Sequence, residues 1–284
     1  MTEDELQALR REKWHINGRP VRTLEDARSF IESVGFCQMY PSRPPLLLPT
    51  FIGAWVGGDD LLPSVQQAFA DARARDATEL MVRQLRDRSA YEANFSDENN
   101  SLLIAATVFP YFYALVGERN PRQAPKAGAR SPYSQLACDT HDAIRRGGPI
   151  SKQQLLTTLG KGISAAALDR ALIELWSKLR ITRVDYNPEE GASWDLLTRW
   201  APEAVREGIQ ISVPEAISAL ISKYFDGVIA AEQAELESFF GKFVSRSRIR
   251  EAVNALLAAR ELSFAHVGSR TLIQIAAPRV AHRA

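Results

Sequence analysis

The sequence predicts an α+β, mostly helical fold in which the second half of the chain carries one module twice. Apolar positions recur 81 residues apart without a gap, and each copy combines helical apolar periods with two short strand-like segments. Ser and Gly stand where the helices should begin and end. The composition agrees, because 284 residues with 45% hydrophobic and 24% charged side chains are typical of a folded chain.

The repeat can be followed residue by residue. Its matched pairs include a shared glycine and a shared serine as well as apolar positions, which chance seldom produces over such a length. The clearest pairs are Leu155 with Leu236, Gly160 with Gly241, Ser164 with Ser245, Leu172 with Val253, and Ile181 with Leu262.

Each copy reads as three helices followed by a β-hairpin. In the first copy we expect helices over 133–146, 151–159 and 164–179, then strands over 181–186 and 193–197. In the second copy we expect helices near 213–226, 231–240 and 245–260, then strands over 261–267 and 270–276. This order is that of the winged helix-turn-helix.

Residues 1–117 are predicted to form a third, divergent unit with a helical insertion. Thr23 can cap a helix whose inward face holds Phe30 and Ile31, and the Pro-rich stretch 41–49 must be a loop or an extended segment. We expect amphipathic helices within 61–91 and a buried strand leading into a helix started by Pro110 within 102–116. The expected organisation is thus 1–117, a basic linker over 118–132, and winged-helix units over 133–210 and 211–284.

Charge is local in this chain, because 35 Lys and Arg against 34 Asp and Glu leave a formal net charge of only +1. The second copy has Arg246, Arg248 and Arg250 where the first has Ala165, Ala167 and Asp169. The start of this third helix is the part of a helix-turn-helix that meets bases and phosphates. We therefore predict DNA contacts from Lys242, Ser245, Arg246, Arg248 and Arg250, with Ser245 capping the helix. The alternatives are a solvated face paired with nearby Glu residues, or a protein-interaction module.

Weaker basic patches lie elsewhere. Four cations of the linker, Arg119, Arg122, Lys126 and Arg130, against Glu118 leave a local charge of +3. An extended basic linker suits tracking along phosphates, although basic loops are also common without any ligand. Lys161 is a further candidate in the first copy, which is otherwise nearly neutral.

Several function classes are disfavoured. The acidic N-terminal sequence lacks an apolar signal-peptide region, and the apolar run 102–116 is interrupted by Pro110 and is short for a membrane span, so we expect a cytoplasmic protein. Cys37 and Cys138 are expected to be free thiols. The four histidines are far apart and lack zinc-ligand spacing, and no nucleotide or hydrolase motif is present, so neither a metal nor a cofactor is expected.

A tandem winged-helix chain with a divergent first unit, and with Val34-Gly35-Phe36-Cys37-Gln38-Met39-Tyr40 after its first capped helix, resembles the AlkZ/YcaQ-type DNA glycosylases. The resemblance implies three winged-helix units that excise alkylated bases, including bases in interstrand crosslinks. It also implies a catalytic pair, Gln-x-Gln or Gln-x-Asp, of which Gln38 matches the first member. Tyr40 stands at the second position, where the family has Gln or Asp.

This departure bears on activity. Hydrolysis of an N-glycosidic bond needs an amide or carboxylate to orient water and stabilise the positive sugar, and a neutral phenol is a poor base. The sequence therefore predicts binding of double-stranded DNA, with little or modest sequence reading, by a relative whose catalytic pair is incomplete. The alternatives are an active glycosylase of alkylated bases, and a winged-helix transcriptional regulator or protein-interaction scaffold.

Overall fold

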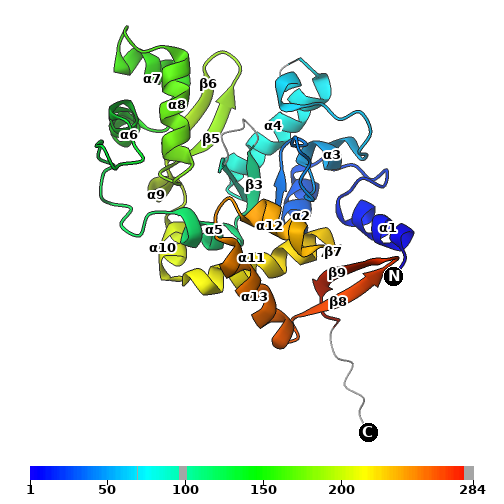
Figure 1. Ribbon diagram of the computed structural model, residues 1–284. Coiled ribbons are helices and arrows are strands. Elements are labelled where there is room, and N and C mark those ends of the chain that lie inside the picture. Colours follow the sequence, from blue (N-terminus) through cyan, green and yellow to red (C-terminus); the bar gives the residue numbers. More distant parts are fainter. Residues whose placement is uncertain (69, 96–100, 278–284) are drawn as a thin grey trace.

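The computed structural model describes residues 1–68, 70–95 and 101–277, and its elements follow one order three times (Figure 1). Each time, a helix leads into a short strand, two further helices follow, and a hairpin of two strands ends the unit. In these residues the strands form three antiparallel sheets, each with the third strand of its unit in the centre.

The first unit contains α2 (Leu24–Val34), β1 (Phe36–Gln38), α3 (Phe51–Val56), α4 (Ala72–Asp87), β2 (Ala90–Ala93) and β3 (Leu102–Ala105). The second contains α6 (Gln135–Gly147), β4 (Ile150–Ser151), α7 (Lys152–Leu159), α8 (Ala165–Trp176), β5 (Ile181–Asn187) and β6 (Gly191–Leu196). The third contains α11 (Val213–Val228), β7 (Ala230–Ala231), α12 (Gln233–Phe240), α13 (Arg246–Ala258), β8 (Leu262–Val267) and β9 (Arg270–Ile275). The remaining elements are α1 (Glu3–Lys13) before the first unit, η1 (Val65–Gln67) between α3 and α4, and the connecting helices α5 (Phe109–Val116), α9 (Leu197–Trp200) and α10 (Pro202–Gln210).

The sheets have the same strand order, β1-β3-β2, β4-β6-β5 and β7-β9-β8. Their registers also correspond, since Phe36 pairs with Ile104, Ile150 with Trp194, and Ala230 with Gln274. The first strand of each unit thus pairs with the central strand, which is the last strand of the unit. This pairing brings the beginning of each unit next to its end.

Local sequence explains where the helices begin and end. Thr23 forms a capping box with Asp26 at the start of α2, and Ser164 accepts a hydrogen bond from the Ala167 amide at the start of α8. Ser245 occupies the equivalent N-cap position of α13, but its hydroxyl makes no capping hydrogen bond. Instead, Ser245 Oγ lies 3.1 Å from Ser247 Oγ, so the capping role expected for this side chain is wrong although its position is right.

The first and third units share one hydrophobic core, whereas the second unit has its own. Phe36 of β1 stacks on Phe239 of α12 with ring centroids 5.4 Å apart, and it meets Phe112 of α5 edge to face at 5.2 Å. The second core is centred on α8, where Leu172 and Trp176 are buried. Figure 1 accordingly shows the second unit, in green, as a lobe set apart from α11, α12 and α2.

Helix α1 joins the beginning of the chain to its third unit. Leu6 packs with Ala230 and Leu272, and the buried Arg10 donates from Nε to the Val228 carbonyl at 3.1 Å and from Nη2 to the Ala230 carbonyl at 2.5 Å. The guanidinium therefore satisfies carbonyls where α11 ends and β7 begins.

The segment between the first two units is not the extended linker that the sequence suggested. It contains turns near 119–123 and 128–131, and the buried Arg180 holds it by donating from Nη1 to the carbonyls of Pro121 at 3.2 Å and Gln123 at 2.9 Å. Helices α9 and α10 then lead from β6 to α11, and α10 packs against α5. None of the described helices has both the length and the apolar character needed to span a bilayer.

Candidate functional site

The start of α13 carries a group of cations on the outer surface of the third unit. Lys242, Arg246 and Arg248 are exposed, while Ile249 and Val253 on the opposite side of the helix are buried. Among the described residues, these three cations have no carboxylate within ion-pair distance. The helix is thus fixed by its apolar face and presents positive charge at its N-terminal end.

Arg250 differs from its neighbours. Its Nε and Nη2 donate to the two carboxylate oxygens of Glu237 at 2.8 and 3.2 Å, which links α13 to α12. The hydrogen bond from Arg250 is the largest cause that lowers the pKa of Glu237. The pairing of Arg250 with a nearby Glu, considered from the sequence as an alternative, is present at this arginine.

The linker cations have unlike surroundings. Arg119 donates from Nη1 to the carbonyls of Ile209 at 2.6 Å and Ile211 at 3.2 Å, so its guanidinium satisfies the end of α10. Arg122, Lys126 and Arg130 are exposed, and Lys161 is exposed in the turn between α7 and α8. DNA contact by any of them stays a prediction.

Gln38, the last residue of β1, lies beneath the Pro-rich segment. Its backbone N–H donates to the Pro49 carbonyl at 3.0 Å, and its side chain is buried. It lines a cavity of about 210 Å³ together with Ser42, Leu46 and Leu48. The segment 41–49 thus covers this glutamine.

Tyr40 lines a different and larger cavity. Its hydroxyl lies 3.4 Å from Thr78 Oγ1 of α4, and burial raises the pKa of this phenol. Gln38 and Tyr40, proposed from the sequence as a catalytic pair, therefore do not share one cavity. At neutral pH the phenol stays protonated.

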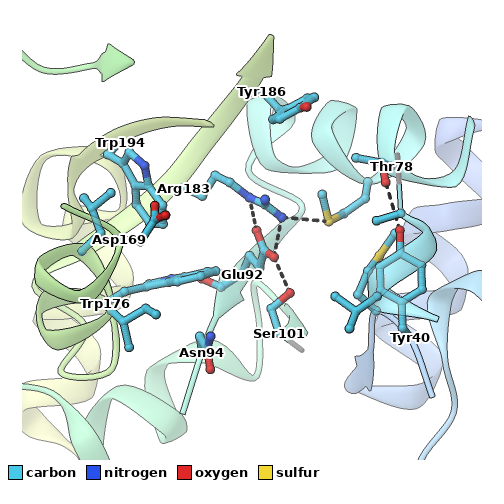
Figure 2. A pocket seen from close by; sticks show the side chains of 16 residues that line it. Tyr40, Thr78, Glu92, Asn94, Ser101, Asp169, Trp176, Arg183, Tyr186 and Trp194 are labelled. Carbon is cyan, nitrogen blue, oxygen red and sulfur yellow. Dashed lines mark hydrogen bonds and ion pairs between the residues drawn. The ribbon is translucent and has the colours of Figure 1, made fainter. Parts of the chain in front are cut away.

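The larger cavity, of about 380 Å³, lies between the first and second units. Figure 2 shows Trp176, Trp194 and Asp169 of the second unit on one side, and Tyr40 and Thr78 of the first unit on the other. The remaining lining residues are Met39, Val65, Ala68, Met81, Glu92, Asn94, Ser101, Leu172, Ile173, Arg183 and Tyr186. Neither of the two units could build this site alone.

An ion pair between the units lies in this cavity. Glu92 of β2, whose side chain is 1% exposed, accepts hydrogen bonds from Arg183 Nε at one carboxylate oxygen and from Nη2 at the other. Ser101 Oγ also donates to this carboxylate, and Trp176 Nε1 donates to the Glu92 carbonyl at 3.0 Å. Because a buried carboxylate needs such partners, the contact fixes β2 against α8 and β5.

Aromatic rings form much of the wall on the side of the second unit. The rings of Trp176 and Trp194 meet edge to face with centroids 4.9 Å apart, and the guanidinium carbon of Arg183 lies 6.0 Å from the centroid of Trp176. Tyr186 is half-buried where β5 ends. Asp169 also lines the cavity, and its carboxylate pairs with Lys152 Nζ at 2.6 Å.

Sequence reasoning did not single out Glu92, Arg183 or the two tryptophans. The ion pair joins residues 91 positions apart, and Trp176 reads as one more apolar position on its helix. The available signal was an acid, Glu92, inside the otherwise apolar strand 90–93. In the described part of the chain, no three His, Cys, Asp or Glu side chains gather as a metal site would require.

The three repeated units and the cations at the start of α13 can now be compared with known proteins. The family described as DNA glycosylase AlkZ-like matches residues 63–284, most of the chain, and the protein belongs to this AlkZ-like family. The resemblance inferred from the sequence is confirmed. The matched range begins after Gln38 and Tyr40, so it does not include that pair.

The DNA glycosylase AlkZ of Streptomyces sahachiroi has a similar structure. The two share 13% sequence identity with a TM-score of 0.60, over 97% of this chain and 70% of that one. At this identity the likeness establishes the fold. A search of curated proteins found no match.

Proposed function

We propose that this protein binds double-stranded DNA, with little sequence reading, through winged-helix units, and that its family catalytic pair is incomplete. Membership of a DNA glycosylase family supports DNA as the partner. The observation that carries the proposal is the exposed cation group, Lys242, Arg246 and Arg248, where α13 begins.

The position of these cations matters more than their number. A helix N-terminus has free amide groups and a positive dipole end, so it favours acidic side chains or bound anions. Basic side chains there are unfavourable unless an anion neutralises them. In a winged helix this end of the third helix approaches the DNA backbone and the major groove, which supplies the phosphates.

The surroundings of Gln38 and Tyr40 support the loss of the family chemistry. Gln38 lies under the segment 41–49, and Tyr40 offers a protonated phenol that hydrogen-bonds within the protein. Gln38 and Tyr40 line different cavities, so they offer no shared site at which an amide and a second amide or carboxylate could orient water towards the sugar. Glu92 is the buried carboxylate in the cavity that Tyr40 lines, and both of its oxygens accept hydrogen bonds from Arg183.

Salt dependence of duplex binding tests the proposal. Titration of a fluorescent duplex at several salt concentrations should give a steep log–log slope, and Lys242→Ala, Arg246→Ala and Arg248→Ala together should reduce it by up to about 0.9 for each phosphate that is no longer neutralised. Arg206→Ala is the control, because this arginine is exposed, lies away from α13 in the sequence and pairs with Glu203 of its own helix. An unchanged slope in the triple variant overturns the assignment, and no binding even at low salt favours a protein-interaction scaffold.

An active glycosylase is the second candidate, since the protein belongs to a family of DNA glycosylases and Gln38 matches the first member of the family pair. Incubation with a duplex containing methylated purines, followed by chromatography of released bases, separates the two functions. We expect no release above the uncatalysed rate. Release that Gln38→Ala abolishes would show that the family pair works despite Tyr40.

A further inference from the structure

We propose that the cavity between the first and second units binds one planar nitrogen heterocycle of nucleobase size, and binds it without breaking a bond. The inference rests on the proposed function in one respect, namely that DNA would present the heterocycle. A free base in solution has the same chemistry and is the simplest probe of the site.

The size and shape of the cavity suit such a ligand. Its volume of about 380 Å³ falls at the lower end of the range of small-molecule sites, about 300–1,000 Å³. Its lining combines buried residues such as Met39, Leu172 and Trp194 with half-buried ones such as Ala68 and Tyr186, which we call its rim because solvent reaches them. A ligand can therefore enter at the rim and leave most of its surface covered.

The walls offer flat surfaces. Trp176 and Tyr186 come from the second unit and Tyr40 from the first, and the guanidinium of Arg183 is planar as well. The ion pair with Glu92 fixes this guanidinium in place, so it would lose little freedom on binding. Nucleobases stack on aromatic rings and on arginine planes, because every base has a π face.

Polar groups line the cavity where the edges of a heterocycle would lie. The hydroxyls of Ser101 and Thr78 donate to the Glu92 carboxylate and to the Ala74 carbonyl, so their oxygens can accept from a heterocycle N–H, and Asn94 adds an amide to the lining. A mainly apolar cavity with a few placed polar groups is the usual form of a site for an uncharged heterocycle.

The charges of the lining disfavour a phosphate group on the ligand. The acidic and basic side chains that line the cavity are Glu92, Asp169 and Arg183, of which Arg183 is already neutralised by Glu92. Phosphate recognition instead uses clustered cations or free helix N-termini. The cavity should therefore prefer a neutral heterocycle over the same heterocycle carrying phosphate.

Calorimetric titration of the full chain with adenine, adenosine and adenosine monophosphate tests this order. Adenine and adenosine should bind with similar affinity, and the monophosphate should bind more weakly. Tyr186→Ala should weaken adenine binding by about five-fold or more, as expected when a stacking ring is removed, while Tyr186→Phe keeps the ring and should bind like the wild type. Tighter binding of the monophosphate, or equal loss in both Tyr186 variants, overturns the proposal.

Filling the cavity gives an independent check. Ala68→Trp places an indole at the rim and should abolish adenine binding, whereas Ala70→Trp puts the same side chain on exposed surface that does not line the cavity. Matching circular dichroism and unfolding midpoints would show that both variants fold. Adenine binding that survives Ala68→Trp shows that the base does not occupy this cavity.

The source of the heterocycle is tested with DNA. A duplex with one unpaired adenine should bind more tightly than the fully paired duplex, and Ala68→Trp should remove this preference while the salt slope stays unchanged. If duplex binding fails but adenine still binds, the proposed function fails and the cavity assignment stands. If duplex binding holds but neither adenine nor the unpaired base is preferred, the cavity assignment fails alone.

Discussion

Replacement of Arg183 by leucine should destabilise the protein far more than loss of an ordinary surface arginine. The variant leaves the carboxylate of Glu92, whose side chain is 1% exposed, with Ser101 as the remaining side-chain donor shown in the structure. Removing one partner of a buried ion pair costs about 3–5 kcal/mol, because the other charge stays buried and uncompensated. The Arg183 side chain is itself 21% exposed, so water can reach the site and we expect a value of about 3 kcal/mol.

Urea unfolding followed by circular dichroism measures this cost as a fall in the midpoint at unchanged slope. Arg206→Leu, which removes an exposed arginine paired with Glu203, is the control and should change little. The double variant Glu92→Gln with Arg183→Leu should be more stable than Arg183→Leu alone, because no buried charge is left without a partner. A cost for Arg183→Leu no larger than for the control, or a double variant less stable than the single one, would refute the reasoning.

Three further predictions concern single residues. Arg180→Met should free the segment 118–132 from its buried anchor, and limited proteolysis should then cut within this segment faster than in the wild type. Burial lowers the pKa of His141 from 6.5 to about 4, so this imidazole is neutral in the folded protein. The free energy of unfolding should be unaffected by it above about pH 6.5 and should fall as the pH drops from 6.5 towards 4, and chemical unfolding of His141→Leu across that range should lack this part of the decline. Gly208→Ala should destabilise the protein, since a Cβ there would lie 2.7 Å from a carbonyl oxygen of α5, whereas Gly162→Ala meets nothing within 4 Å and should unfold at the wild-type midpoint.

The repeated elements could be predicted because their signals are local. The expected strands over 261–267 and 270–276 agree with β8 and β9 within a residue, since a helical period gives way there to alternation around Gly268. The strand and Pro-started helix expected within 102–116 are β3 and α5. In the first unit, β1 has only three residues, and its pairing with β3 is set by contacts that no local pattern encodes.

The candidate site was less accessible to sequence reasoning. The cations at the start of α13 could be recognised because the repeat allows each residue of the second copy to be compared with the residue at the same position of the first copy. The cavity depends on two units meeting, and its ion pair joins β2 to β5 across 91 positions. Arg119 and Arg250 were predicted to contact DNA, but they bind a carbonyl and a carboxylate of the protein itself. The sequence shows that a residue is basic and does not show whether the protein already supplies its partner.

The shared core of the first and third units constrains the order in which parts of the chain can fold during synthesis. Phe36 needs Phe239 as its stacking partner, and that residue leaves the ribosome about two hundred residues later. The second unit, with a core of its own, can fold while the chain is still growing. Until the third unit has been synthesised, the aromatic surface of the first unit stays exposed to solvent. The nascent chain is therefore prone to aggregate through this surface during translation.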